Sequence, residues 1–84
     1  MDNPYQLETP EETARELAAK VRKVRLARKW KQSTLADRAG VSLASLRRFE
    51  QTGQISLKNL LLLAFALGRL DNFASLFQQS KAGS

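Results

Sequence analysis

The chain has 84 residues, of which 43% are hydrophobic, and it carries a formal net charge of +6. This length suits one small domain, and its basic balance favours a polyanionic partner, with nucleic acid ahead of an anionic membrane. The chain contains neither cysteine nor histidine, which excludes disulfides, zinc–thiolate sites and the commonest general base. Because its carboxylates are scattered rather than paired, we expect no enzyme activity, no metal and no cofactor.

Neither a membrane span nor a secretion signal is visible in the sequence. The longest apolar run, residues 60–67, is far shorter than the roughly 20 residues that cross a bilayer. Residues 1–8 are acidic and polar, unlike a signal peptide. We therefore expect a cytoplasmic protein without a membrane partner. Its parts would be an N-terminal arm (1–8), one domain (9–79) and a flexible tail (80–84).

The first predicted helix covers about residues 10–30 and carries opposite charges at its two ends. Thr9 as N-cap, Pro10 at the first helical position and Glu12 two residues later form a capping-box pattern. Acidic residues dominate its beginning, whereas residues 20–31 are basic and contain no acid. Because this polarity also suits the helix dipole, the basic run alone does not establish a nucleic-acid site.

Two short helices are predicted next, at residues 32–39 and 43–51, with a tight turn between them. Gly40 can end the first helix because glycine adopts positive φ, and Ser42 can cap the second. Val41 can fill the space between the two helices. The pattern is a helix-turn-helix candidate, although an ordinary helix pair in a small bundle would have the same spacing.

The helix at 43–51 has two different faces. At 100° per residue, Leu46, Phe49 and Glu50 share one side, which must be buried. A buried carboxylate needs a partner, and Arg25 of the first helix is the candidate; alternatively, Glu50 stays hydrated at the boundary. The opposite, exposed face consists of Ala44, Arg47, Arg48 and Gln51.

Paired arginines on that exposed face suit DNA binding. Arginine can bind O6 and N7 of guanine in the major groove, or it can hold a phosphate, and the sequence leaves both roles open for Arg47 and Arg48. The small Ala44 allows a close approach. A methyl group of alanine or leucine, here Leu43, can also pack on a thymine methyl.

Two more helices are predicted, at 57–67 and at about 71–78. The former begins after a capping Ser56, ends at Gly68, and is apolar on almost every side. The residues assigned to the core are Leu57, Leu60, Ala64 and Leu67. The remaining apolar side chains can be covered by the last helix or can form a homodimer interface; the candidate interface consists of Leu62, Phe65, Arg69, Phe73 and Phe77.

Three large side chains are assigned neither to the core nor to the DNA-binding or dimer surfaces. Trp30 is expected at the boundary of the core. Tyr5 and Leu7 can pack either on their own domain or on a partner.

Residues 21–68 read VRKVRLARKWKQSTLADRAGVSLASLRRFEQTGQISLKNLLLLAFALG. Arg25 and the blocks QSTLADRAGVS, LRRFEQTG and SLKNLLLLAFALG occur here in one register, and through them the chain resembles the Cro/C1 (XRE) helix-turn-helix family. The resemblance implies an all-α, compact five-helix bundle of the lambda-repressor-like type. It also implies binding to a double-stranded DNA operator, usually as a dimer.

Site residues follow from the resemblance position by position. It implies that Gln32 holds a phosphate and that Arg25 and Glu50 form a structural ion pair. The implied base-reading positions are Leu43, Ala44, Arg47 and Arg48. The implied backbone contacts are Ser42, Ser45, Gln51, Thr52 and Gln54, and we add Lys31 for its charge. Lys29 and Lys31 stand where many members have glycine and a capping serine or threonine, and Leu43 and Ala44 replace polar readers.

The extended first helix and the ending ISLKNLLLLAFALGRLDNFASLF resemble HipB-type regulators, which are encoded beside HipA-like kinases. This implies a repressor that is also the antitoxin of a toxin–antitoxin module, with a HipA-like toxin kinase as partner. Two alternatives stay open. One is a stand-alone or phage-type repressor, and the other is an interaction subunit that mainly binds a toxin kinase.

Overall fold

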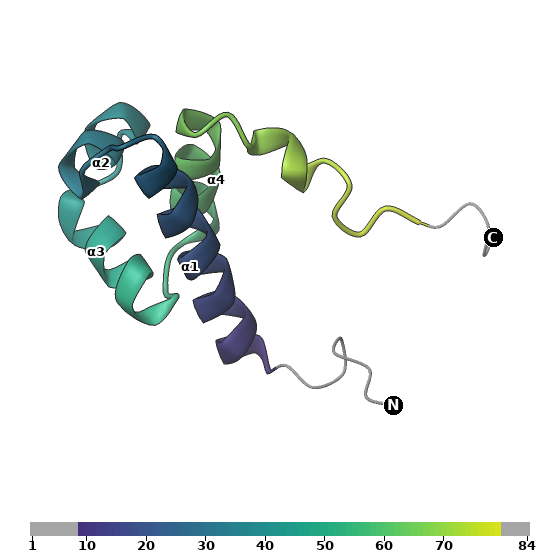
Figure 1. The fold of residues 1–84 in the computed structure, drawn as a ribbon. Helices are drawn as coiled ribbons and strands as arrows, with labels where there is room; N and C mark the ends of the chain where they lie inside the picture. Colours follow the sequence, from purple (N-terminus) through teal and green to yellow (C-terminus); the bar gives the residue numbers. More distant parts are fainter. Residues whose placement is uncertain (1–8, 80–84) are drawn as a thin grey trace.

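The computed structural model describes residues 9–79 as a helical bundle with no strand in that range. Its elements are α1 (Pro10–Ala27), α2 (Gln32–Ala39), α3 (Leu43–Thr52), α4 (Leu57–Ala66) and the short 3₁₀ helix η2 (Leu70–Phe73) (Figure 1). Residues 9–79 are therefore all-α, as predicted, but they form four α-helices rather than five. The predicted arm and tail lie outside the described residues.

Helix α1 begins with the predicted capping box. The Glu12 amide donates to Thr9 Oγ1 at 3.1 Å, and the Thr9 amide donates to Glu12 Oε1 at 2.9 Å. The helix ends at Ala27, so its predicted extension to about residue 30 is wrong. Lys29 adopts a φ of 60°, a left-handed conformation that cannot continue an α-helix. The end of the basic run therefore lies in the connection to α2.

The turn between α2 and α3 has the predicted construction. Gly40 adopts a φ of 74° as the C-cap of α2, and Val41 is buried. The Ser42 hydroxyl accepts a hydrogen bond from the Ser45 amide at 3.1 Å, which caps α3. Helix α3 packs against α1 and α2, while α2 also packs against α4.

The core lies where these four helices meet. Its largest fully buried side chains are Leu35, Leu46, Phe49, Leu63 and Leu67. The loop after α3 also packs closely on α1. Gly53 has a φ of 81°, and a Cβ there would lie 2.8 Å from the Ala14 carbonyl carbon. Only glycine adopts this positive φ without strain and also leaves room for the Ala14 backbone. Gly53 therefore sets the distance between this loop and α1.

The buried side of α4 differs from the predicted one. Leu63 is fully buried although it was not assigned to the core, and Leu57, which was assigned, is 68% exposed. Leu67 and Ala64 are buried as predicted. A helix that is apolar all round carries no periodic signal that fixes its rotation, so contacts with α2 decide which side turns inward.

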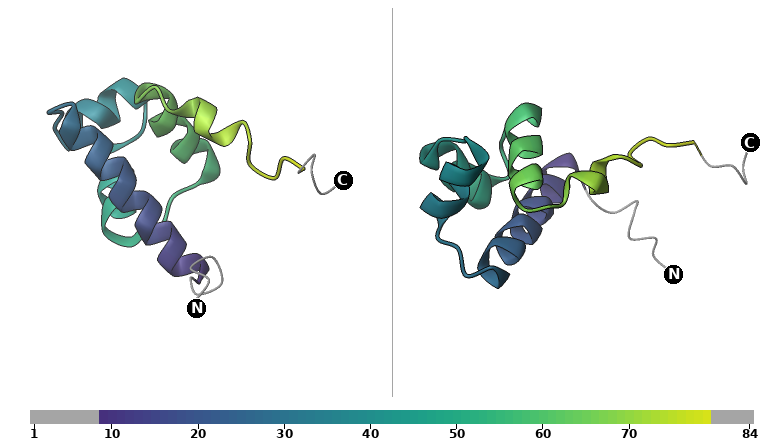
Figure 2. Two further views of the ribbon diagram at one scale, coloured as in Figure 1. Left: turned by 45° about the vertical axis from the view of Figure 1, so that its right-hand side comes forward. Right: turned by 90° about the horizontal axis from the view of Figure 1, so that it is seen from above.

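The predicted fifth α-helix is the four-residue η2 followed by turns. Arg69 provides no side-chain cap, and η2 has no buried residue, so little stabilises a longer helix here. Of the two alternatives for the outer apolar side chains of α4, the covering of Phe65 by this segment is not found in residues 9–79, because Phe65 is 70% exposed and Phe77 is fully exposed. The segment leaves α4 and extends away from the bundle (Figure 2).

None of the helices within residues 9–79 combines the length and apolar composition needed to cross a bilayer.

Candidate nucleic-acid interface

A buried ion pair fixes α3 against α1. Arg25 donates from Nε to Glu50 Oε2 at 2.8 Å and from Nη2 to Glu50 Oε1 at 3.0 Å. The two side chains are only 7% and 4% exposed. Arg25 Nη1 also donates to the Trp30 carbonyl oxygen at 2.8 Å. Glu50 therefore has the partner expected from the helical wheel, and the bidentate geometry sets the rotation of α3.

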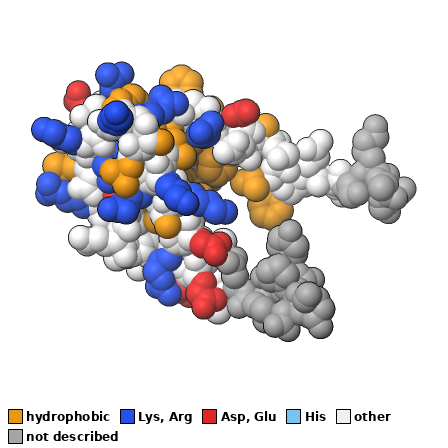
Figure 3. All heavy atoms as spheres, in the orientation of Figure 1, with side chains coloured by type: hydrophobic (Ala, Val, Ile, Leu, Met, Phe, Trp, Pro, Cys, Tyr) orange, Lys and Arg blue, Asp and Glu red, His pale blue; other side chains and the backbone are white. Residues whose placement is uncertain are grey.

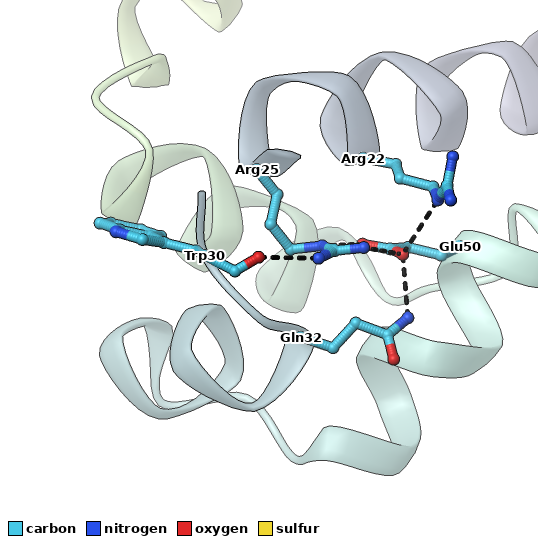
Figure 4. A network of polar contacts seen from close by, with 5 residues as sticks. All are labelled: Arg22, Arg25, Trp30, Gln32 and Glu50. Carbon is cyan, nitrogen blue, oxygen red and sulfur yellow. Dashed lines mark hydrogen bonds and ion pairs between the residues drawn. The ribbon is translucent and has the colours of Figure 1, made fainter. Parts of the chain in front are cut away.

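Gln32 joins this pair to the start of α2. Its Nε2 donates to Glu50 Oε1 at 2.9 Å, and Arg22 Nε lies 4.0 Å from the same oxygen. Figure 4 shows these groups converging on the Glu50 carboxylate. Among residues 9–79 the Gln32 side chain makes only this hydrogen bond, so its amide oxygen and its second N–H can contact a ligand. Arg22 was not among the predicted site residues, although it lies one helical turn before Arg25.

The exposed face of α3 has the composition that the helical wheel predicts. Leu46 and Phe49 are fully buried, whereas Leu43 and Ser45 are half-buried. The exposed residues are Ala44, Arg47, Arg48, Gln51 and, at the end of the helix, Thr52. A helix with a small residue and two arginines on its outer face can enter a major groove closely and donate hydrogen bonds there.

The two arginines differ in their freedom. Arg48 Nη2 donates to Gln54 Oε1, so this guanidinium is held toward the loop that follows α3. Arg47 is exposed and makes no side-chain hydrogen bond or ion pair with another residue in 9–79. Arg47 alone is therefore able to direct all five donors of its guanidinium to a ligand.

The hydroxyl groups around α3 shape the backbone at its two ends. Ser42 Oγ donates to Ser45 Oγ at 2.9 Å in addition to its capping bond. Thr52 Oγ1 donates to the Arg48 carbonyl oxygen at 2.7 Å and accepts from the Gln54 amide at 3.1 Å. These contacts hold the loop beside the exposed arginines.

The start of α2 is basic and uncapped. Lys31 is its exposed N-cap residue and makes no side-chain capping bond. The first turn of α2 thus lacks a side-chain cap, and the positive end of its dipole together with the charge of Lys31 favours a phosphate. On the face drawn in Figure 3, lysine and arginine side chains lie over the end of the molecule that holds α2 and α3 and continue across α1.

The residues of the predicted dimer interface lie on two surfaces. Leu62 and Phe65 border a shallow hollow on the outer side of α4, together with Leu57 and Leu61. The other members lie elsewhere. Arg69 and Phe73 line a separate hollow beside α1, and Phe77 lines neither.

The fold and this basic face define a helix-turn-helix DNA-binding domain. Residues 21–71, more than half of the chain, match the profile of a protein family described as helix-turn-helix. The chain belongs to this family, of the Cro/C1 type, and is thus a DNA-binding transcriptional regulator. A comparison with curated proteins found no match.

Proposed function

We propose that the protein is a sequence-specific, operator-binding repressor that reads DNA with α3. One observation carries this proposal: the buried Arg25–Glu50 pair holds α3 in a rotation that leaves Arg47 exposed next to Ala44, with no side-chain partner among residues 9–79. A recognition helix needs both a rigid support and free donors on its outer face.

The contacts of the two arginines favour different roles. Arg47, which has no side-chain partner in the described part of the chain, suits a bidentate contact with guanine O6 and N7. Arg48 is tied to Gln54 and suits a phosphate beside the loop. Leu43 and Ala44 are apolar and suit thymine methyls. Lys31 and Gln32, at the start of α2, suit a phosphate of the flanking backbone.

Alanine variants of the two arginines test these roles. Arg47→Ala should weaken operator binding by ~1–3 kcal/mol and relax the preference at one base pair, whereas Arg48→Ala should weaken binding to all sequences and lower the salt slope by about 1. Selection from a random DNA pool identifies the operator, and titrations at several salt concentrations measure both effects. Arg15→Ala, an exposed arginine on α1, is the control. Unchanged operator binding by both variants would remove α3 from the reading role.

The repressor would act as a homodimer. Two-fold symmetry lets two copies of α3 contact half-sites about 34 Å apart. The outer side of α4 is suited to the contact between copies, because Phe65 and Leu57 are 70% and 68% exposed there. Contiguous exposed apolar surface of this kind marks an interaction site.

An antitoxin role is the second candidate. Leu76 and Phe77 are large, apolar and exposed on the segment that extends from the bundle, in the part of the chain that resembles HipB-type regulators. This segment would contact a HipA-like toxin kinase in the cytoplasm. Coexpression with a kinase encoded next to this gene should give a stable complex that Phe77→Ser weakens while operator binding is retained. Absence of any complex would leave the stand-alone repressor.

A further inference from the structure

An apolar hollow of about 320 Å³ lies between α1, α4 and the C-terminal segment, outside the candidate DNA interface. Its lining from α1 and α4 includes Leu17, Val21, Val24 and Leu60, all of them only half-buried in residues 9–79. These side chains pack against the core from its edge. The floor of the hollow is thus core surface that nothing in residues 9–79 covers.

The rim of the hollow is cationic. Lys20 and Arg69 line it, and Lys23 borders a smaller hollow next to it that also includes Arg69. Neither Lys20 nor Arg69 makes a side-chain hydrogen bond or ion pair with another residue in 9–79. An occupant that matches this surface would have large apolar side chains flanked by carboxylates.

The N-terminal residues of this chain have that composition. Residues 1–8 read MDNPYQLE, in which Tyr5 and Leu7 are flanked by Asp2 and Glu8 and no residue is basic. These residues lie outside the described range, and they join α1 at its N-cap Thr9, whose backbone is extended.

We propose that residues 1–8 fold back along α1, with Tyr5 in the apolar hollow and Asp2 near the cationic rim. The lengths agree. Leu17 lies about 12 Å along the helix axis from Thr9 at 1.5 Å per residue, and an extended segment from Thr9 to Tyr5 spans about 13 Å. Asp2 can likewise reach about 23 Å from Thr9, which is the position of Lys23 on α1 at about 21 Å.

This placement assigns the N-terminal residues to the protein's own domain rather than to DNA. Asp2 and Glu8 would be repelled by phosphates, and Asp2, at the far end of the segment, would be attracted by Lys20 and Arg69. The arm would also offset positive charge on the α4 side of α1. The net positive surface would then be concentrated on α2 and α3.

NMR spectroscopy of the full chain tests the proposal directly. We expect nuclear Overhauser contacts between the Tyr5 ring and the methyl groups of Leu17 and Val21. A mixture of isotope-labelled and unlabelled chains separates contacts within one molecule from contacts between two. Contacts within one molecule support the proposal. Absence of these contacts overturns it, and contacts only between molecules overturn it in favour of a second copy as the occupant.

A pair of variants provides an independent measurement. Tyr5→Ser combined with Leu7→Ser should increase the fluorescence of an added apolar dye several-fold and shift the Val21 and Val24 methyl resonances, because the hollow becomes open to solvent. The control Asn3→Ser should change neither. If the double variant, like the control, leaves dye binding and these resonances unchanged, residues 1–8 do not occupy the hollow.

Discussion

The helix-turn-helix unit and the C-terminal third of this small domain differ in how completely their side chains are satisfied. In α2 and α3 the large apolar side chains are buried except for the half-buried Leu43. The turn is closed by Gly40 and Ser42, and the inward carboxylate, Glu50, has its partners. In α4 and the segment after it, large apolar side chains face solvent. The first region is thus complete within one chain, whereas the second offers apolar surface to another molecule.

The difference follows from the residue patterns. A helix with one apolar side has one rotation that buries it, so the outer face of α3 is left with polar groups. Helix α4 is apolar on nearly all sides, so any rotation exposes some of them. The two surfaces therefore suit different partners. The polar outer face of α3 suits DNA, and the apolar outer face of α4 suits another protein.

The largest expected loss of stability comes from removing the Arg25–Glu50 ion pair, which holds α3 against α1. Glu50→Ala removes the carboxylate and leaves the Arg25 guanidinium buried without its bidentate partner, so the free energy of unfolding should fall by ~3–5 kcal/mol. Urea denaturation measures this change. Operator binding should weaken as well, since the rotation of α3 depends on the pair.

Arg22 provides the matched comparison. Its Nε also lies near Glu50, at 4.0 Å, but its side chain is 58% exposed. Arg22→Ala should change the free energy of unfolding by less than ~1 kcal/mol, as is usual for exposed ion pairs. Equal effects of Glu50→Ala and Arg22→Ala would show that burial of Arg25 does not decide the stability of this network.

Sequence reasoning located the helix-turn-helix unit because its signals are local. Gly40 and Ser42 mark the ends of α2 and α3, and the pattern of α3 places Glu50 inward, which required a partner on another helix. The contact of Gln32 with Glu50 was not predicted. It depends on how closely the start of α2 approaches α3, a tertiary distance that no local pattern encodes. The DNA-contact and dimer assignments stay predictions.

The C-terminal third was predicted less well, for two physical reasons. The uniform apolarity of α4 left its rotation undetermined, which led to Leu57 rather than Leu63 in the predicted core. The sequence at 71–78 has helix-compatible residues, but helix formation in a short segment depends on packing. Because η2 has no buried residue, that packing is missing in residues 9–79.

A smaller effect on stability is expected at the start of α2, which has no side-chain cap. Lys31→Ser would supply the missing N-cap hydroxyl of α2 and should raise the free energy of unfolding by about 1 kcal/mol. Operator binding should nevertheless weaken, because a cation near the backbone is lost. Thermal unfolding measures the change in stability, and salt titrations of operator binding measure the lost phosphate contact. Lys31→Ala, which removes the charge without adding a cap, should weaken binding without the gain in stability; an equal gain would rule out capping as its cause.

The smallest effect on folding is expected on the outer side of α4. Phe65 is 70% exposed, so Phe65→Gln should change the free energy of unfolding of the monomer by no more than about 0.5 kcal/mol. Its effect should instead fall on association, measured by sedimentation across a range of protein concentrations. The control Arg15→Gln changes an exposed residue of α1 that does not line the hollow beside Phe65 and should alter neither quantity. If Phe65→Gln lowers monomer stability and leaves association unchanged, Phe65 is covered within its own chain, and the contrast between the two regions no longer holds.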